Sequence, residues 1–188
     1  MRQLILVRHS APEMVPDVPA SRWRLSEEGR RRCEKLATLL AIHQPAVIVT
    51  SQEPKAIETG KIVARTLGLP SETAPDLYEH NRPNADPLGT REQFEAQVIR
   101  LFEHPDELVF GSETADEAHS RFSAAIANVL DQHPEGNLAV VTHGTVMTLF
   151  IAHATGLDPI PFWKSLSLPA FAVLSLSDLR LLEVVTNV

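Results

Sequence analysis

Short apolar runs alternate along the chain with segments in which apolar residues recur every three or four positions. The runs at 4–7, 46–50 and 138–142 are rich in Val, Ile and Leu. Such runs are typical of strands that are buried on both faces, as in parallel sheets. Two further runs, 170–176 and 181–185, have only a short polar stretch between them and predict a hairpin.

The segments between these runs have helical patterns with recognisable ends. Ser26, followed by two acidic residues, is typical of an N-cap, and Pro54 suits the first turn of a helix that Gly68 would end. The predicted helices span 27 to about 40, 54–67, 90 to about 103, 114 to about 132, and 144 through 151. This order predicts an α/β fold, a three-layer αβα sandwich with a mostly parallel central sheet and an antiparallel edge.

Length, charge and cysteine content narrow the class of protein. A chain of 188 residues is most simply one domain, 1–188, and its net charge of −7 argues against binding nucleic acid or an anionic membrane through a basic face. Cys33 is the only cysteine, so an intrachain disulfide or a cysteine metal cluster is excluded. The first residues lack a secretory-signal pattern, and no apolar run approaches the ~18 residues of a membrane span. We therefore expect a cytoplasmic protein.

The ends of three predicted strands carry residues that can bind an anion. The first strand ends in Arg8-His9 and the last parallel strand in His143-Gly144, while Lys55 lies in the first helical turn after the middle strand. Because open parallel sheets bind ligands at the carboxyl ends of their strands, we expect these side chains to converge on one crevice. The helix amino termini beside Lys55 and after Gly144 would add N–H donors, an environment that suits a phosphate dianion.

Five motifs, in order along the chain, resemble those of the histidine phosphatase superfamily, the phosphoglycerate mutase-like group. Arg8-His9 resembles the family's Arg-His-Gly motif, with Ser10 in the glycine place. WRLSEEGRRRCEKL resembles the stretch that opens the first helix, and SQEPKAIETGKIVA resembles the family's Ser-x-x-x-Arg-Ala-x-x-Thr-Ala element. DLYEHNRP resembles the loop that carries an acidic proton donor, and VVTHGTVM resembles the second histidine motif. The resemblance covers the chain from Leu4 to about Leu149.

The resemblance implies a role for each matching residue. His9 would attack phosphorus and form a phosphohistidine, which water then hydrolyses. Arg8 would clamp the phosphoryl oxygens, and His143 would stabilise the charge that develops on them. Lys55 and Gly144 would complete the phosphate site.

The acidic proton donor has three candidates within one loop. Glu79 fits the family's pattern best and would act first as general acid and then as general base. Asp76 and His80 lie close enough in sequence to remain alternatives.

Two departures from the family pattern bear on phosphate binding. Lys55 stands where the family has arginine, and it lacks the planar fork of donors that binds phosphate in bidentate fashion. Phosphate binding would then be looser, unless Arg22, Arg24 or Arg82 compensates for that loss. Ser10 adds a hydroxyl where the family has glycine. We therefore consider Ser10, Arg22 and Arg82 candidate substrate-binding residues.

These features favour a phosphomonoester hydrolase of the histidine acid phosphatase type, which acts on a small phosphorylated substrate without metal or cofactor. A phosphoglycerate mutase-type isomerase is less favoured, because the chain lacks a long insertion between Glu79 and His143. A catalytically weakened module that binds phosphate or a phosphoprotein is the other alternative. A metallohydrolase is disfavoured because the histidines form no H-E-x-x-H pattern. The segment 70–89 is predicted to be irregular and would help to set substrate specificity. The edge strand of the hairpin would allow a homodimer to form.

Overall fold

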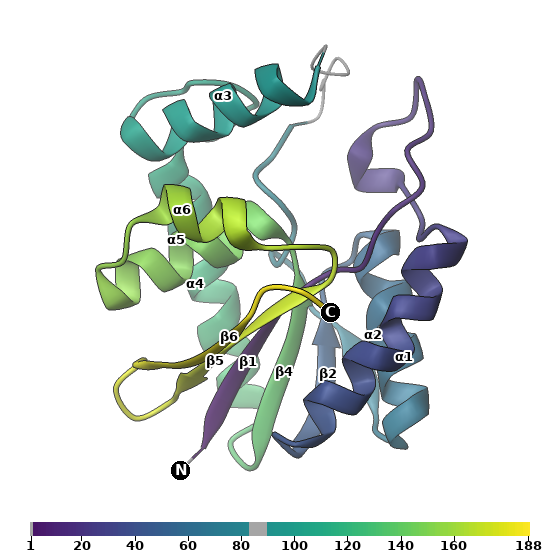
Figure 1. Cartoon of the computed structure of the whole chain (residues 1–188). Helices are drawn as coiled ribbons and strands as arrows, with labels where there is room; N and C mark the ends of the chain where they lie inside the picture. The colour runs from purple at the N-terminus through teal and green to yellow at the C-terminus, as the bar shows by residue number, and fades with distance from the viewer. Residues whose placement is uncertain (1, 83–89) are drawn as a thin grey trace.

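The computed structural model describes residues 2–82 and 90–188 and has a six-stranded sheet at its centre (Figure 1). The strands are β1 (Gln3–Arg8), β2 (Pro45–Thr50), β3 (Ser71–Thr73), β4 (Asn137–Thr142), β5 (Ala170–Ser175) and β6 (Leu181–Val185), in the spatial order β3-β2-β4-β1-β5-β6. β1, β2, β3 and β4 are parallel to their neighbours within this group, whereas β5 pairs antiparallel with both β1 and β6. The predicted parallel sheet with an antiparallel edge is confirmed.

Helices cover both faces of the sheet, which confirms the three-layer sandwich. The apolar residues of α1 (Glu27–Ala41) and α2 (Pro54–Leu67) pack with one face of the strands, and those of α4 (Ala115–Gln132) and α5 (Gly144–Thr155) pack with the other. The first layer contributes buried residues such as Leu36, Leu40 and Val63, and the second contributes Phe122, Ile126 and Ile151. α3 (Arg91–Glu103) and α6 (Pro159–Ser165) complete the second side, with α3 beyond the carboxyl ends of the strands (Figure 1).

The carboxyl ends of the three central parallel strands lie level with one another. Arg8 is in register with Thr142, and Thr50 is in register with Val141. The ladder continues one residue further, because His9 N–H donates to the Thr142 carbonyl at 2.9 Å and Ser51 N–H donates to the Val141 carbonyl at 2.9 Å. Residues just beyond these strands are therefore brought to one edge of the sheet.

The helix ends follow the expected local chemistry. The Ser26 side chain accepts a hydrogen bond from the N–H of Gly29, and Gly68 ends α2 in a left-handed conformation with φ of 68°. Thr90 and Thr114 each form a capping box at the start of α3 and α4. These four contacts confirm the predicted boundaries to within about two residues.

Three short elements are not apparent from the sequence pattern. They are the 3-10 helix η1 (Ala20–Arg22), the helix α6 and the strand β3. Each is too short to show a period of its own, and β3 lies inside the segment 70–89 that the sequence indicated as irregular. Residues 83–89 of that segment lie outside the described residues. Within residues 2–82 and 90–188, no helix combines the length and apolar character needed to cross a bilayer.

Gly29 is the point at which α1 packs against the chain that follows β1. A Cβ at this position would collide with the carbonyl oxygen of Ala11, which is backbone and cannot rotate away. We expect Gly29→Ala to lower the free energy of unfolding by about 1–3 kcal/mol, as other overpacking substitutions do. Urea unfolding measures the loss, and Glu34→Ala on the exposed face of α1 is the control. Equal stability of the two variants would contradict this packing.

Candidate active site

Two histidine side chains meet at the sheet edge, one after β1 and one after β4. The ring centroids of His9 and His143 are 5.2 Å apart, and the ring planes are inclined by 64°. Both residues are buried, with 7% and 0% of their surface exposed. The predicted convergence of the two strand ends is therefore present in the structure.

The hydrogen bonding of His9 defines which ring nitrogen is free. Its Nδ1 lies 2.7 Å from the carbonyl oxygen of Ser10. A carbonyl oxygen can only accept, so Nδ1 carries the proton and Nε2 keeps its lone pair. Burial, followed by the charges of His143 and Lys55, holds the pKa of His9 well below its ordinary value. His9 is thus a neutral ring with an unprotonated Nε2 at neutral pH.

His143 is held from the side of β2. Its Nε2 lies 2.9 Å from Ser51 Oγ and 3.5 Å from Glu53 Oε1, whereas its Nδ1 has no hydrogen-bond partner among the described residues. Burial and then the charge of Lys55 lower the pKa of His143 well below its ordinary value, although Glu79 acts in the opposite direction. The ring is therefore neutral in the free protein, and a bound anion would favour its protonated form.

Arg8 lies against the first residue of α5. Its Nη1 donates to the Leu166 carbonyl at 2.5 Å, and its buried Nε has no hydrogen-bond partner among the described residues. A Cβ on Gly144 would come within 3.0 Å of this Nε, so a larger residue here would press against the guanidinium. Since buried polar atoms are nearly always paired, the free nitrogens of Arg8 and His143 are those that a bound oxyanion would satisfy.

Glu79 occupies the amino terminus of α5. Its carboxylate accepts hydrogen bonds from the N–H groups of Thr145 at 3.1 Å and Val146 at 3.2 Å, and from the N–H of His80 at 2.9 Å. The expectation that this helix terminus offers free donors to phosphate is therefore wrong for these two groups. The positive end of the helix stabilises a carboxylate instead.

Arg82 connects Glu79 to α3. Its Nη2 lies 3.7 Å from Glu79 Oε2, and its guanidinium packs over the rings of Phe94 at 4.9 Å and Phe110 at 5.8 Å. Burial acts to raise the pKa of Glu79, but the charges of Arg82 and His143 and the backbone donors outweigh it and lower the pKa below its usual value. Glu79 is therefore ionised in the free protein at neutral pH.

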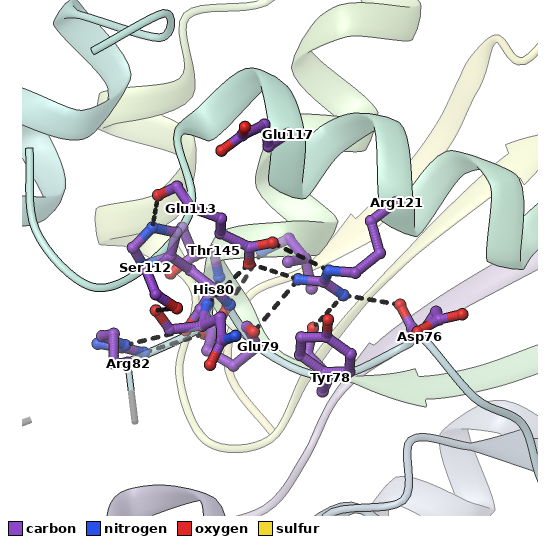
Figure 2. A network of polar contacts seen from close by, with 12 residues as sticks. Asp76, Tyr78, Glu79, His80, Arg82, Ser112, Glu113, Glu117, Arg121 and Thr145 are labelled. Atoms are coloured by element: carbon purple, nitrogen blue, oxygen red, sulfur yellow. Dashed lines mark hydrogen bonds and ion pairs between the residues drawn. The ribbon is translucent and has the colours of Figure 1, made fainter. Parts of the chain in front are cut away.

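Arg121, on α4, fixes the loop that carries Glu79 (Figure 2). It donates to the carbonyls of Asp76 at 2.7 Å, Tyr78 at 3.0 Å and Glu79 at 3.3 Å. The same guanidinium forms two hydrogen bonds with the Glu113 carboxylate, at 2.7 and 3.1 Å, and lies 3.6 Å above the Tyr78 ring. Because Asp76 has a φ of 61°, a region that non-glycine residues seldom adopt, the loop depends on such external support.

The two alternatives to Glu79 are used differently. His80 lies 2.8 Å through its Nε2 from the carbonyl of Glu113, and Asp76 is exposed on the side of the loop that faces Arg121 (Figure 2). Of the three candidates, Glu79 is the one whose side chain is bound by the amino terminus of α5. Arg121 and Glu113 are not predicted from the sequence as parts of this arrangement, because single charged residues in or beside a helical pattern are typical of a solvent-exposed surface.

Lys55 lies in the site, but its ammonium group is already engaged. Its Nζ is 2.7 Å from Glu53 Oε2 and donates to the carbonyl of Ala20 at 2.6 Å. Lys55 and Glu53 are both buried, with 5% and 8% of their surface exposed. Glu53 was not identified from the sequence, where it falls at an unspecified position of the family pattern.

The three candidate substrate-binding residues differ in the contacts that their side chains make. Ser10 Oγ donates to the Gly29 carbonyl at 2.7 Å, and Ser10 N–H donates to Thr59 Oγ1 at 3.0 Å, so the hydroxyl is turned toward α1. The Arg22 side chain is exposed on η1 and forms no hydrogen bond or ion pair with the residues that the structure describes, so its part in substrate binding stays a prediction. The Arg82 side chain contacts Glu79. Within residues 2–82 and 90–188, no three His, Cys, Asp or Glu side chains are grouped to hold a metal ion.

We expect the ion pair between Arg121 and Glu113, whose side chains are largely buried, to stabilise the fold. We expect Arg121→Gln to lower the free energy of unfolding by about 3 kcal/mol, because it leaves the Glu113 carboxylate buried without its partner. The double variant Arg121→Gln/Glu113→Gln should lose less than the sum of the two single variants, as expected for residues in contact. Urea unfolding measures all three. Additive losses would mean that the pair is not coupled.

The neutral, buried histidines link stability to pH. An unfolded imidazole has a pKa near 6.5, whereas the folded pKa of His143 is well below that value. Between the two values the unfolded chain binds more protons, so stability falls as the pH is lowered through about 6.5. We expect His143 to contribute a loss of about 1 kcal/mol in unfolding free energy between pH 7 and pH 5.5. His143→Gln should remove that part of the loss, and the exposed control His104→Gln should not; equal pH dependence of all three proteins would contradict this linkage.

The chain is similar in sequence or in structure to several phosphatases. A curated relative, the uncharacterised phosphatase PhoE of Bacillus subtilis (strain 168), is 24% identical over 167 residues, which cover 85% of this chain and 80% of the relative. A mycobacterial glucosyl-3-phosphoglycerate phosphatase, solved in complex with inorganic phosphate, has a TM-score of 0.75 at 22% identity and covers 100% of this chain and 98% of its own. The α-ribazole phosphatase of Shigella flexneri has a TM-score of 0.73 at 19% identity, with 98% and 96% of the two chains covered.

The two solved structures establish the phosphoglycerate mutase-like fold. The family match extends beyond the individual motifs and covers residues 4–181, from β1 to the start of β6. That range includes both histidines and every other member of the site described above. The chain belongs to the histidine phosphatase superfamily (branch 1), a family of phosphatase-type enzymes.

Proposed function

We propose that this protein hydrolyses a small phosphomonoester through a phosphohistidine intermediate, without a metal ion. The observation that carries the proposal is the hydrogen bond from His9 Nδ1 to the Ser10 carbonyl, which leaves Nε2 as a free nucleophile beside His143. Arg8 and Lys55 supply positive charge at the same edge of the sheet. A nucleophile fixed among cations suits attack on a phosphorus atom whose oxygens are negatively charged.

In the first step, Nε2 of His9 forms a bond to phosphorus and the bond from phosphorus to the ester oxygen breaks. Glu79 donates a proton to the leaving oxygen, so the alcohol departs neutral. His9 Nδ1 keeps its proton throughout and donates it in a hydrogen bond to the Ser10 carbonyl. This hydrogen bond stabilises the positively charged ring of the phosphohistidine. The unpaired nitrogens of Arg8 and His143 bind the phosphoryl oxygens, where charge develops.

In the second step, Glu79 accepts a proton from water while the water oxygen forms a bond to phosphorus. The bond from phosphorus to Nε2 breaks, His9 returns to its neutral form, and inorganic phosphate leaves with Glu79 protonated. Since the pKa of Glu79 is lowered in the free protein, the proton for the first step arrives with the substrate. Phosphomonoesters bind their second proton with a pKa near 6, so catalysis should weaken as the pH rises above about 6.

A second candidate is a module that binds phosphate with little turnover. Two contacts favour it: Lys55 is bound by Glu53, and Glu79 is bound by the amino terminus of α5. Both groups must be released or shared before they can act on a substrate. Measured turnover and its dependence on His9 distinguish the two functions.

Hydrolysis of p-nitrophenyl phosphate in excess EDTA tests the proposal. We expect wild-type turnover to survive the chelator, with kcat/KM higher near pH 5.5 than near pH 8. His9→Ala should reduce kcat by at least about 10³-fold, because the nucleophile is lost, and Glu79→Gln should reduce it by about 10²- to 10⁴-fold. His104→Ala, which removes an exposed histidine, is the control and should match wild type.

Three outcomes would count against this mechanism. Activity that disappears with EDTA would indicate a metal-dependent reaction, and activity retained by His9→Ala would exclude phosphohistidine. Wild-type protein that binds inorganic phosphate in calorimetry but shows no turnover between pH 5 and pH 8 would favour the binding module.

A further inference from the structure

Glu53 is a buried acid in the site to which the proposed mechanism gives no task. Its Oε2 lies 2.7 Å from Lys55 Nζ, and its Oε1 accepts a hydrogen bond from Glu79 N–H at 3.1 Å. The same Oε1 lies 3.5 Å from Nε2 of His143. A single carboxylate therefore contacts the cation, the acid-carrying loop and the second histidine.

The position of Glu53 in the chain leaves its side chain free for the site. It is the N-cap residue of α2, a position where Ser, Thr, Asp or Asn side chains typically accept hydrogen bonds from the first N–H groups of the helix. The Glu53 side chain forms no such bond, and it extends into the site toward Lys55. The amino terminus of α2 therefore has no side-chain cap from Glu53, and the Glu53 carboxylate lies next to the Lys55 ammonium group instead.

The ammonium of Lys55 has a limited number of donors. One of its three N–H groups donates to the Ala20 carbonyl, and the ammonium also forms an ion pair with Glu53 Oε2 at 2.7 Å, so a phosphoryl oxygen must compete with Glu53 for the remaining donors. Lys55 nevertheless lies near the second histidine, because the two oxygens of Glu53 lie 2.7 Å from Lys55 Nζ and 3.5 Å from His143 Nε2. A phosphate that enters the site must therefore share the Lys55 ammonium group with Glu53. The negative charge of the Glu53 carboxylate would also repel the phosphate.

We propose that Glu53 is a positioning residue that sets the affinity of the site for phosphate. It holds Lys55 in place as one half of a neutral pair, and its charge opposes the phosphate dianion, so that the product is bound weakly and released. This inference rests on the proposed function, because it assumes that phosphate binds between His9, His143 and Arg8. An arginine without an adjacent acid would bind the same anion more tightly, through two parallel hydrogen bonds.

The substitution Glu53→Gln tests the inference, because glutamine keeps an oxygen that can accept from Glu79 N–H while it removes the charge. We expect the Kd of inorganic phosphate, measured by calorimetry at pH 7, to fall by about tenfold or more. Phosphate should also become a stronger competitive inhibitor of p-nitrophenyl phosphate hydrolysis by the same factor. Glu34→Gln removes one negative charge from the exposed face of α1 and should leave both constants unchanged.

A merely structural role for Glu53 predicts the opposite result. If Glu53 only held the site together, its loss would weaken phosphate binding or leave it unchanged, and either outcome in a folded Glu53→Gln protein overturns the inference. Circular dichroism and thermal unfolding establish that the variant is folded. If it is not, Glu53→Gln/Lys55→Arg is compared with Lys55→Arg alone, so that the two proteins differ only in the charge of residue 53, and tighter phosphate binding by the double variant is again expected.

The inference and the proposed function fail in distinguishable ways. Wild-type protein that neither binds phosphate nor turns over a phosphomonoester overturns the function, and this inference with it. Wild-type turnover that depends on His9, together with unchanged phosphate affinity in Glu53→Gln, overturns the inference alone.

Discussion

The parallel pairing of β1 with β4 is the constraint on which the site depends. His9 and His143 are far apart in sequence, and they meet because Arg8 is in register with Thr142 and the ladder extends to His9 N–H. Side chains alternate between the two faces of a strand, so a slip of one residue would exchange the faces on which all of them lie. The buried apolar runs of both strands fix the register, since each must match a helix layer on either side. The placement of the reacting groups is thus a result of core packing.

Backbone groups and paired ions make the burial of so many charges tolerable. Each carboxylate in or near the site has a counter-charge and at least one N–H donor: Glu79 has Arg82 and α5, Glu53 has Lys55, and Glu113 has Arg121. An isolated buried charge would cost several kcal/mol, and pairing with hydrogen bonds offsets that cost. Among the described residues, Arg8 Nε and His143 Nδ1 are buried nitrogens of the site without a hydrogen-bond partner. They identify where an anion would complete the arrangement.

The sequence predicts the fold well, and it predicts the site in part. Long periodic segments and strong caps, such as Ser26 and Gly68, determine their own structure locally, so α1 and α2 could be placed in advance. Strand ends that share one sheet edge predict the meeting of His9 with His143. The residues that support the Glu79 loop could not be predicted, because Arg121 contacts this loop from more than forty positions away in the sequence. The same holds for Ser10. The sequence does not show that its hydroxyl donates a hydrogen bond to the Gly29 carbonyl, because this contact depends on how α1 packs against the chain after β1.

The contact of Arg82 with Phe94 gives α3 an influence on a carboxylate that the helix itself does not touch. Phe94 and Phe110 hold the guanidinium near Glu79, and the position of that charge helps to determine how readily the carboxylate takes up a proton. We therefore expect a change in how α3 packs to alter the proton affinity of Glu79 without replacing any reacting group. The aromatic face of this peripheral helix is thus a position from which substitutions would adjust the acidity of the site while His9, Glu79 and His143 stay the same.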